Sequence, residues 1–273
     1  MSSYEIFAIR YAHVDLKRSI CFLGAPDDGT MQGLDFFFWV VVGEGRTIVV
    51  DTGFNAEVAA RRNRVATLPP AAALAHLGID PASVDTVVMT HLHYDHAGNS
   101  DLFPNARFHL QRAEMAFATG PAMCDAATAH HYAADDICRF VRLVHDGRVV
   151  FADGPVDLAP GLSLHPVPGH TDGLQVVRAM TAGGPTVIAS DAAHYYASIR
   201  DGRPFPVFTD EQLKLTGYRT LKMLAGGSDR IIAAHDPEVM RLFPDRAGHP
   251  DIVRISGDPI APIASAAPIF PLS

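Results

Sequence analysis

The fold and the chemistry of this chain are organised around one stretch of sequence, Thr90-His91-Leu92-His93-Tyr94-Asp95-His96-Ala97-Gly98-Asn99. The segment before it, Thr86-Val87-Val88-Met89, is β-branched and apolar, which is typical of a short buried strand. The histidines therefore lie in the loop that leaves the carboxyl end of a strand, where open α/β sheets place their functional groups. Imidazole and carboxylate groups this close together indicate a site for zinc or a related metal.

The spacing within this stretch predicts two neighbouring metal positions. His91 and His93 are two residues apart, so on an extended segment their side chains lie on the same side. Asp95 and His96 follow where the chain turns, and we expect them to supply a second, adjacent centre. The alternative is a polar loop whose histidines only pack in the core, and the density of ligand-type residues argues against it.

The segment His91-Leu92-His93-Tyr94-Asp95-His96 resembles the signature of the metallo-β-lactamase superfamily. The resemblance implies an α/β fold, the four-layer αβ/βα sandwich, with one or two metals at the edges of the sheets. It also implies three further ligands in later loops, and the matching positions are His170, Asp191 and His235. The similarity extends from about residue 36 to residue 235, with all ligand positions in the expected order.

The resemblance divides the ligands between two metals that share one carboxylate. One metal is held by His91, His93 and His170, the other by Asp95, His96 and His235, and Asp191 is the bridge. A bridging carboxylate suits a hydrolytic centre whose metals lie roughly 3.5–4 Å apart. Such a centre leaves room for water, which as a metal-bound hydroxide near neutral pH would attack an acyl carbon. We expect two zinc ions, with other divalent metals as alternatives.

Within the superfamily, this motif together with Ser190-Asp191-Ala192-Ala193 is similar to that of the N-acyl homoserine lactonases and related lactone hydrolases. The similarity implies that the chain opens a lactone ring, with a quorum-quenching role if the lactone is an N-acyl homoserine lactone. Two positions differ from that pattern. Where those lactonases have a tyrosine three residues after the bridging aspartate, this chain has His194, followed by Tyr195 and Tyr196. Where they tend to read Gly-His-Thr-Pro-Gly-His, this chain reads Gly169-His170-Thr171-Asp172-Gly173-Leu174.

We assign catalytic roles to Asp95, His194 and Tyr196. His194 can donate a proton or a hydrogen bond to the substrate, because the unperturbed pKa of histidine lies near the working pH range. Tyr195 and Tyr196 are adjacent and point in different directions, so at most one of them shares the site. The alternative is that all three side chains only line the pocket. Asp51 is a candidate to orient a metal-bound histidine, or else it caps a turn.

Several other functions remain open at this point. The substrate can be a pyridoxolactone-like or aromatic lactone, a thioester or a β-lactam. A di-iron redox protein would need a flavin domain, for which the chain has no length left. A binding protein without catalytic activity conflicts with the complete set of ligand positions.

Composition restricts the partners and the setting of this chain of 273 residues, for which we expect one domain over residues 1–273. A net charge of -8 argues against nucleic acid, which calls for a basic face. The longest early apolar run, residues 36–42, is far below the ~20 residues that span a bilayer. Three scattered cysteines and the absence of a secretory signal predict a cytoplasmic protein. We expect a small-molecule lactone as partner, and a homodimer is compatible with the sequence.

The periodicity of the chain predicts most of its secondary structure. Strands are expected at residues 5–13, 36–42, 47–50, 107–111, 149–151, 162–167, 174–180, 186–189 and 230–234. Helices are expected at residues 56–62 and 71–77, with an irregular helical region over 112–145. A capping box at Thr209 and Gln212 predicts a further helix to about Ala225, with Leu213 on its apolar stripe. Residues 21–33 are expected to form a loop over the site, and the tail from Gly248 to wrap the surface.

Overall fold

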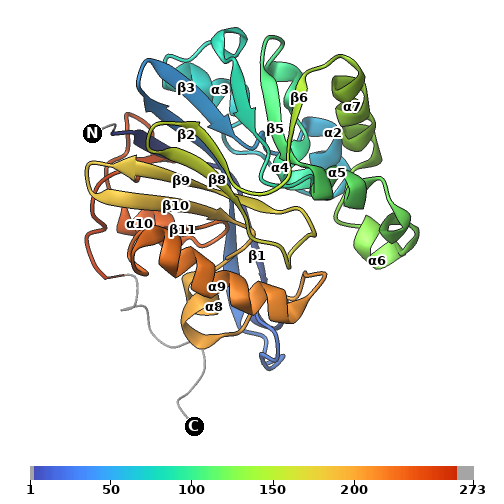
Figure 1. The fold of residues 1–273 in the computed structure, drawn as a ribbon. Helices are drawn as coiled ribbons and strands as arrows, with labels where there is room; N and C mark the ends of the chain where they lie inside the picture. The colour runs from blue at the N-terminus through green and yellow to red at the C-terminus, as the bar shows by residue number, and fades with distance from the viewer. Residues whose placement is uncertain (1–2, 263–273) are drawn as a thin grey trace.

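The computed structural model describes residues 3–262, which form two β-sheets packed face to face (Figure 1). The strands of the first sheet are β1 (Glu5–Lys17), β2 (Met31–Gly43), β3 (Arg46–Val50), β4 (Thr86–Val88), β5 (Arg107–Gln111), β6 (Val149–Ala152) and β12 (Ile252–Arg254). Those of the second are β7 (Val156–Ala159), β8 (Leu162–Pro166), β9 (Gln175–Thr181), β10 (Gly184–Ser190) and β11 (Ile231–Ala233). The spatial orders are β12-β1-β2-β3-β4-β5-β6 and β11-β10-β9-β8-β7.

Helices lie on the outer faces of both sheets, as Figure 1 shows. The first half of the chain contributes α1 (Arg18–Cys21), α2 (Ala56–Arg61), α3 (Pro70–His76), α4 (Tyr94–Ala97), α5 (Arg112–Ala118), α6 (Ala126–Ala129) and α7 (Ala134–His145). The second half contributes α8 (Tyr196–Asp201), α9 (Glu211–Ala225) and α10 (Glu238–Leu242). Three 3₁₀ turns are η1 (Pro81–Ser83), η2 (Ser100–Leu102) and η3 (Pro121–Cys124).

The apolar run in β2 shows how the layers form. Successive side chains of a strand point to opposite faces of the sheet. Phe37 and Trp39 face the second sheet, where they share a core with Ile188 of β10. Phe36 and Phe38 face the helices on the other side. A strand that is covered on both faces can therefore be apolar at every position.

A third core lies between the second sheet and α9, where Tyr218 and Leu221 pack with Val187 and Ile231. The layers are thus helices, sheet, sheet and helices, which confirms the predicted four-layer αβ/βα sandwich. Among the described residues, no helix has the length and apolar character needed to cross a membrane.

Parallel pairing brings the functional loops to one edge of the sandwich. Strands β3, β4, β5 and β6 run parallel to one another, and β10 runs parallel to β11. The carboxyl ends of parallel strands meet at the same edge of a sheet, where α/β proteins place their ligands. Asp51, the loop at residues 89–93, Asp191 and His235 all follow such ends.

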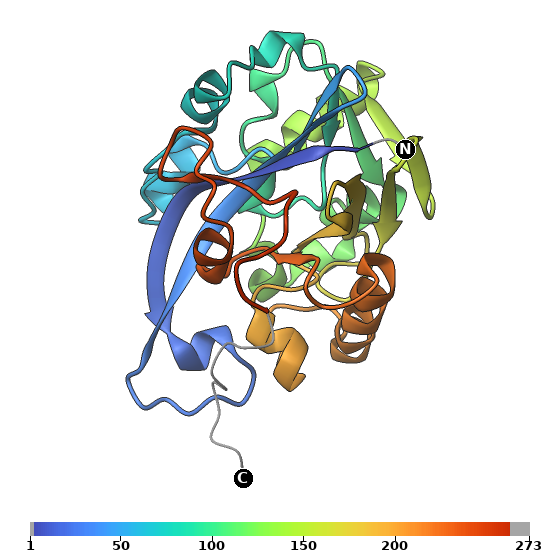
Figure 2. The ribbon, with the colours of Figure 1, turned by 90° about the vertical axis from the view of Figure 1, so that its left-hand side faces the viewer.

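The structure corrects several predicted elements. Strand β1 continues to Lys17, which pairs with Met31 of β2, so this long hairpin projects beyond the rest of the sheet and carries α1 (Figure 2). Of the predicted loop at residues 21–33, only residues 22–30 lie outside α1 and β2. The N-cap of α9 is Asp210 and not the predicted Thr209. The side chain of Asp210 accepts a hydrogen bond from the backbone N–H of Leu213. Leu213 is 46% exposed and so lies off the apolar stripe.

The segment after Gly248 does not only wrap the surface. It forms β12, which pairs with β1 and buries Ile252 and Val253. Residues 263–273 of the predicted surface tail lie outside the described residues. Strand β7 and the helices α8 and α10 were not predicted from the sequence, because each has six residues or fewer and shows little periodicity.

Candidate metal centre

The seven predicted ligands come together at the edge where the two sheets meet. His91 and His93 follow β4, and His93 is the cap residue of α4, whose first turn carries Asp95 and His96. His170 lies between β8 and β9, Asp191 directly follows β10, and His235 lies two residues beyond β11. All seven side chains are buried.

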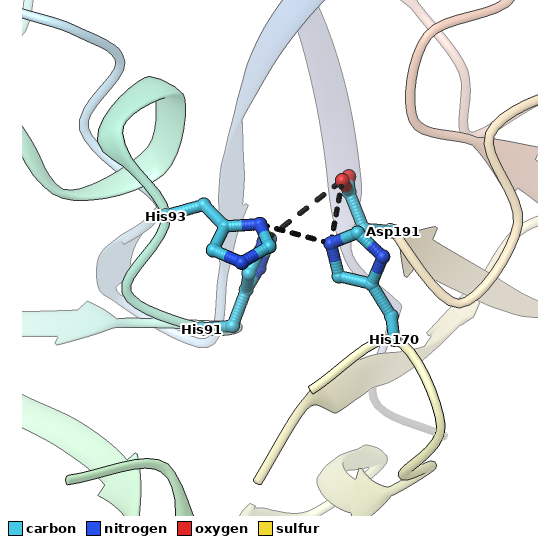
Figure 3. A group of neighbouring side chains, drawn as sticks. All are labelled: His91, His93, His170 and Asp191. Carbon is cyan, nitrogen blue, oxygen red and sulfur yellow. Dashed lines mark hydrogen bonds and ion pairs between the residues drawn. The ribbon is translucent and has the colours of Figure 1, made fainter. Parts of the chain in front are cut away.

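The first group of ligand atoms surrounds one carboxylate oxygen. His170 Nε2 lies 3.0 Å from His93 Nδ1 and 3.2 Å from Asp191 Oδ2. His91 Nε2 lies 3.9 Å from the same oxygen of Asp191. Figure 3 shows these three rings and the carboxylate pointing toward one another. The ligand atoms of the four residues all lie within 4.8 Å of one another.

The second group surrounds the other oxygen of the same carboxylate. Asp191 Oδ1 lies 3.1 Å from His235 Nε2 and 3.3 Å from His96 Nε2. Asp95 Oδ2 completes this group, at 3.7 Å from His96 Nε2 and 3.8 Å from His235 Nε2. Asp191 thus presents one oxygen to each group, which is the geometry that a bridging carboxylate requires.

Hydrogen bonds on the far side of the rings set their orientation. His96 Nδ1 donates to Asp51 Oδ2 over 2.7 Å, and His235 Nδ1 donates to the carbonyl of Asp35 over 2.7 Å. His170 Nδ1 donates to the carbonyl of Val207 over 2.8 Å. Each bond fixes the proton on Nδ1 and leaves Nε2 free to bind a metal, as in many metal sites in proteins.

The residues of the site fit a pair of bound metals. In the described part of the chain, Nε2 of His91 and of His96 are buried without a hydrogen-bond partner. A buried polar atom normally has a hydrogen-bond partner, so these two unpartnered nitrogens are available to bind a metal ion. The donor set of imidazole nitrogens and carboxylate oxygens is one that zinc accepts.

The pKa values of His91 and Asp191 favour the forms that bind metal, whereas the nearby carboxylates Asp191 and Asp95 raise the pKa values of His96 and His235. Burial, together with the neighbouring His96, lowers the pKa of His91 well below its ordinary value, so this imidazole is neutral near pH 7. Burial alone would raise the pKa of Asp191, but His194 and His235 hold it well below the usual range. Metal binding needs neutral imidazoles and ionised carboxylates.

Two residues with unusual backbone angles lie beside the site. Asp51 has φ 61° and Ser190 has φ 44°, in the left-handed region that residues other than glycine rarely adopt. Both contact Thr90, whose hydroxyl lies 2.7 Å from Asp51 Oδ2 and 2.7 Å from Ser190 Oγ. The strain is thus stored where the two sheets join, next to the ligands.

Two buried charged residues that were not predicted from the sequence support the ligand loops. Glu114 of α5 accepts from the backbone N–H of Leu92 over 2.9 Å and from the hydroxyl of Thr171 over 2.5 Å. Lys214 of α9 donates to the carbonyl of Asp191 over 2.9 Å. Burial raises the pKa of Glu114 to about 7 and lowers that of Lys214 to about 7.

The structure separates the three candidate donors. His194 reaches the site, where its Nε2 lies 3.2 Å from Asp191 Oδ2 and its ring stacks on Phe205 at 4.2 Å. The hydroxyl of Tyr195 donates to the carbonyl of Gly33 over 3.2 Å. Tyr196 packs in the core between the sheets and does not line the cavity over the metal ligands.

That cavity has a volume of about 410 Å³ and opens above the ligands. Its lining includes Arg62, Arg64, His130, His131, Leu16, Ile20, Phe205 and Val207. His131 lies close to the ligands, with its ring 5.4 Å from that of His93. Leu16 and Ile20 belong to the end of β1 and to α1, so this part of the hairpin contributes to the cavity, whereas none of residues 21–33, the predicted loop over the site, lines it.

Comparison with known proteins finds relatives that are named as metal-dependent hydrolases or lactonases. The chain is 31% identical over 188 residues to an N-acyl homoserine lactonase of Azorhizobium caulinodans, covering 64% of this chain and 66% of the relative. It is 29% identical over 237 residues to a probable metallo-hydrolase of Mycobacterium tuberculosis, covering 77% and 73%. The match thus spans slightly less than two thirds of the lactonase's own length.

Solved structures show the same fold. An N-acyl homoserine lactone hydrolase with N-hexanoyl-L-homoserine bound at its metal centre superposes with a TM-score of 0.74 at 21% identity, over 88% of this chain and 96% of that one. A dizinc quorum-quenching lactonase gives a TM-score of 0.66 at 16% identity, over 86% and 91%. The family model described as the metallo-beta-lactamase superfamily matches residues 37–235. This chain belongs to the metallo-β-lactamase superfamily.

Proposed function

We propose that this protein is a dinuclear metal-dependent hydrolase that opens a lactone ring. The observation that carries the proposal is the position of Asp191, with one oxygen toward His170 and the other toward His235. A carboxylate shared in this way holds two metals close together, as two-metal hydrolases require. We further propose zinc, because the seven candidate ligands comprise five imidazoles and only two carboxylates.

Two bound metals would supply an activated water and polarise the carbonyl group of the substrate. The residues of the chain then have separate tasks. Asp51 and the carbonyls of Asp35 and Val207 orient the imidazole ligands. Burial holds the pKa of His194 well below its usual range, so its neutral ring would give a hydrogen bond from Nε2 to the ring oxygen that leaves when the lactone opens.

The choice of a lactone is supported by the curated relatives named N-acyl homoserine lactonase, at 28% and 31% identity. With an N-acyl homoserine lactone as substrate, the activity would be quorum quenching. This chain has His194 at the position where we expect the lactonases to have tyrosine. Because of this difference, the alternative substrates are a pyridoxolactone-like or aromatic lactone, a thioester and a β-lactam.

The test combines metal analysis with a substrate panel. Protein purified without chelator is analysed for bound metal and assayed on lactones, thioesters and β-lactams of similar size. We expect about two metals per chain and hydrolysis of at least one lactone that chelator abolishes and added zinc restores. Turnover without bound metal, or hydrolysis of only thioesters or β-lactams, would refute the proposal.

A further inference from the structure

Two arginines in the cavity over the metal ligands have no acidic partner. Arg62 and Arg64 follow α2 and line this cavity, yet neither takes part in an ion pair of the described residues. Their neighbour Arg61 lies outside the cavity lining, at 3.9 Å from a carboxylate oxygen of Glu57 and 3.7 Å from one of Asp135. Of these three arginines, the two without an acidic partner are therefore the two that line the cavity.

Contacts with Tyr94 and with two backbone carbonyls hold Arg62 next to the candidate ligands. The guanidinium carbon of Arg62 lies 3.8 Å from the centre of the Tyr94 ring, and Tyr94 stands between His93 and Asp95 in the chain. Arg62 also donates to the backbone carbonyls of His130 and Tyr132. These contacts fix its position but leave its charge uncompensated, because carbonyl groups and an aromatic ring carry no net charge.

Arg64 keeps part of its hydrogen-bonding capacity free. In the described structure its Nε is buried and lacks a hydrogen-bond partner. The side chain acts electrostatically on the hydroxyl of Tyr94, which places it beside Arg62. Arg64 also lines the cavity without an acidic partner among the described residues, and the planar donors of a guanidinium group match a carboxylate.

The charges that line the cavity also favour binding of an anion. The acidic residues in its lining are Asp95 and Asp191, and both are candidate metal ligands. With two divalent metals bound, these carboxylates are neutralised and the cavity is positive, although the chain as a whole has a net charge of -8. Such a cavity concentrates anions.

We propose that the substrate carries a carboxylate in addition to its reacting carbonyl, and that Arg62 and Arg64 bind this carboxylate while the metal centre holds the reacting group. This inference rests on the proposed lactone hydrolysis and narrows it to acidic lactones. The side chains of Leu16, Ile20 and Phe205 in the same cavity suit an apolar segment between the two groups.

The experiment uses a pair of lactams, which resist opening and therefore report binding alone. The lactam analogue of N-glutaryl homoserine lactone and its methyl ester differ only in the terminal charge. Calorimetric binding to the zinc-loaded protein at low salt should favour the free carboxylate about tenfold, which corresponds to one well-placed charged contact. Arg64→Met should remove this preference, and Arg62→Met should reduce it.

Arg61→Met is the matched control and should keep the full preference, because Arg61 is paired outside the cavity lining. Equal binding of both lactams, no binding of either, or a preference that survives in Arg64→Met would overturn the proposal. Circular dichroism and thermal melting check that each variant is folded. Hydrolysis of neutral lactones by the same preparations tests the lactonase proposal separately, because it can succeed when the carboxylate preference is absent.

Discussion

Asp51 Oδ2 lies 2.7 Å from His96 Nδ1, and the same carboxylate accepts from the backbone N–H and the hydroxyl of Thr90. One side chain at the end of β3 therefore holds a ligand on α4 and the residue that begins the ligand loop after β4. The pair is fully buried, so water cannot replace either contact. The positive φ of Asp51 brings the carboxylate into this position.

Asp51→Asn should weaken metal binding about 10–100-fold, as changes to residues that orient ligands typically do. Oδ2 of Asp51 accepts from His96 Nδ1 and the Thr90 hydroxyl, and Oδ1 accepts from the Thr90 backbone N–H. Asparagine keeps only one acceptor oxygen, so its NH₂ group would face the N–H of either Thr90 or His96 and that bond would be lost. Competition with a chromophoric chelator measures the affinity. Asp85→Asn, at the exposed amino end of β4, is the control and should bind metal like the unmodified protein. Equal affinities for the two variants would show that Asp51 only shapes its turn.

Asp191→Asn tests the bridge between the two groups. The variant keeps one oxygen, so we expect it to retain about one metal per chain and to lose most of the rate. Elemental analysis gives the stoichiometry. Asp95→Asn changes only the second group and should release mainly that metal, leaving His91, His93 and His170 to hold the first. Two metals and full activity in Asp191→Asn would contradict the bridging role.

His194 and Tyr196 are two residues apart and have different surroundings. His194 Nε2 faces Asp191, whereas the Tyr196 hydroxyl is buried in the core between the sheets without a hydrogen-bond partner among the described residues. We expect His194→Phe to lower kcat on a lactone at least ~30-fold with metal content unchanged, because the leaving oxygen loses its hydrogen-bond donor. Tyr196→Phe should stay near the unmodified rate.

Steady-state kinetics on metal-loaded variants separates the outcomes. If His194→Phe also loses metal, His194 is a ligand and not a donor, because it lies in a group with Asp191 and His235 that could itself hold an ion. If its rate is unchanged, the second metal alone stabilises the leaving oxygen.

The local sequence indicated four candidate ligands, because His91, His93, Asp95 and His96 lie within six positions after an apolar strand. The three later candidates, His170, Asp191 and His235, came from the resemblance to a family. The two-faced burial of β2 was likewise readable from its uninterrupted apolar run. The resemblance to a family supplied the pairing of distant ligands, which spacing alone could not give.

The supporting residues could not be predicted in this way. Glu114 and Lys214 lie on helices with ordinary polar neighbours, and only the packing of α5 and α9 against the ligand loops buries them. Arg64 is equally ordinary in the sequence, and its missing partner is a property of the folded cavity. Strand β12 was not predicted because it has only three residues, and these form a strand only by pairing with β1.

The raised pKa of Glu114 predicts a pH-dependent stability. Burial moves its pKa from 4.5 in the unfolded chain to about 7 in the folded one, with the Tyr132 hydroxyl facing the carboxyl group at 3.4 Å. Between these values the folded state keeps a proton that the unfolded state has lost, so this contribution to stability is complete below pH 4.5 and is lost as the pH rises toward 7. The full change is on the order of 3 kcal/mol.

Urea unfolding of the metal-free protein from pH 4.5 to pH 7.5 measures this contribution. We expect the free energy of unfolding to fall less steeply with pH in Glu114→Gln than in the unmodified chain, because glutamine does not titrate. The difference in slope is the readout, so a general loss of stability in the variant does not affect the result. Glu57→Gln, on the exposed face of α2, should keep the original slope. Identical slopes for the unmodified chain and Glu114→Gln would mean that Glu114 is ionised in the folded protein throughout this range. Its carboxylate would then hold the loops of Leu92 and Thr171 as an anion.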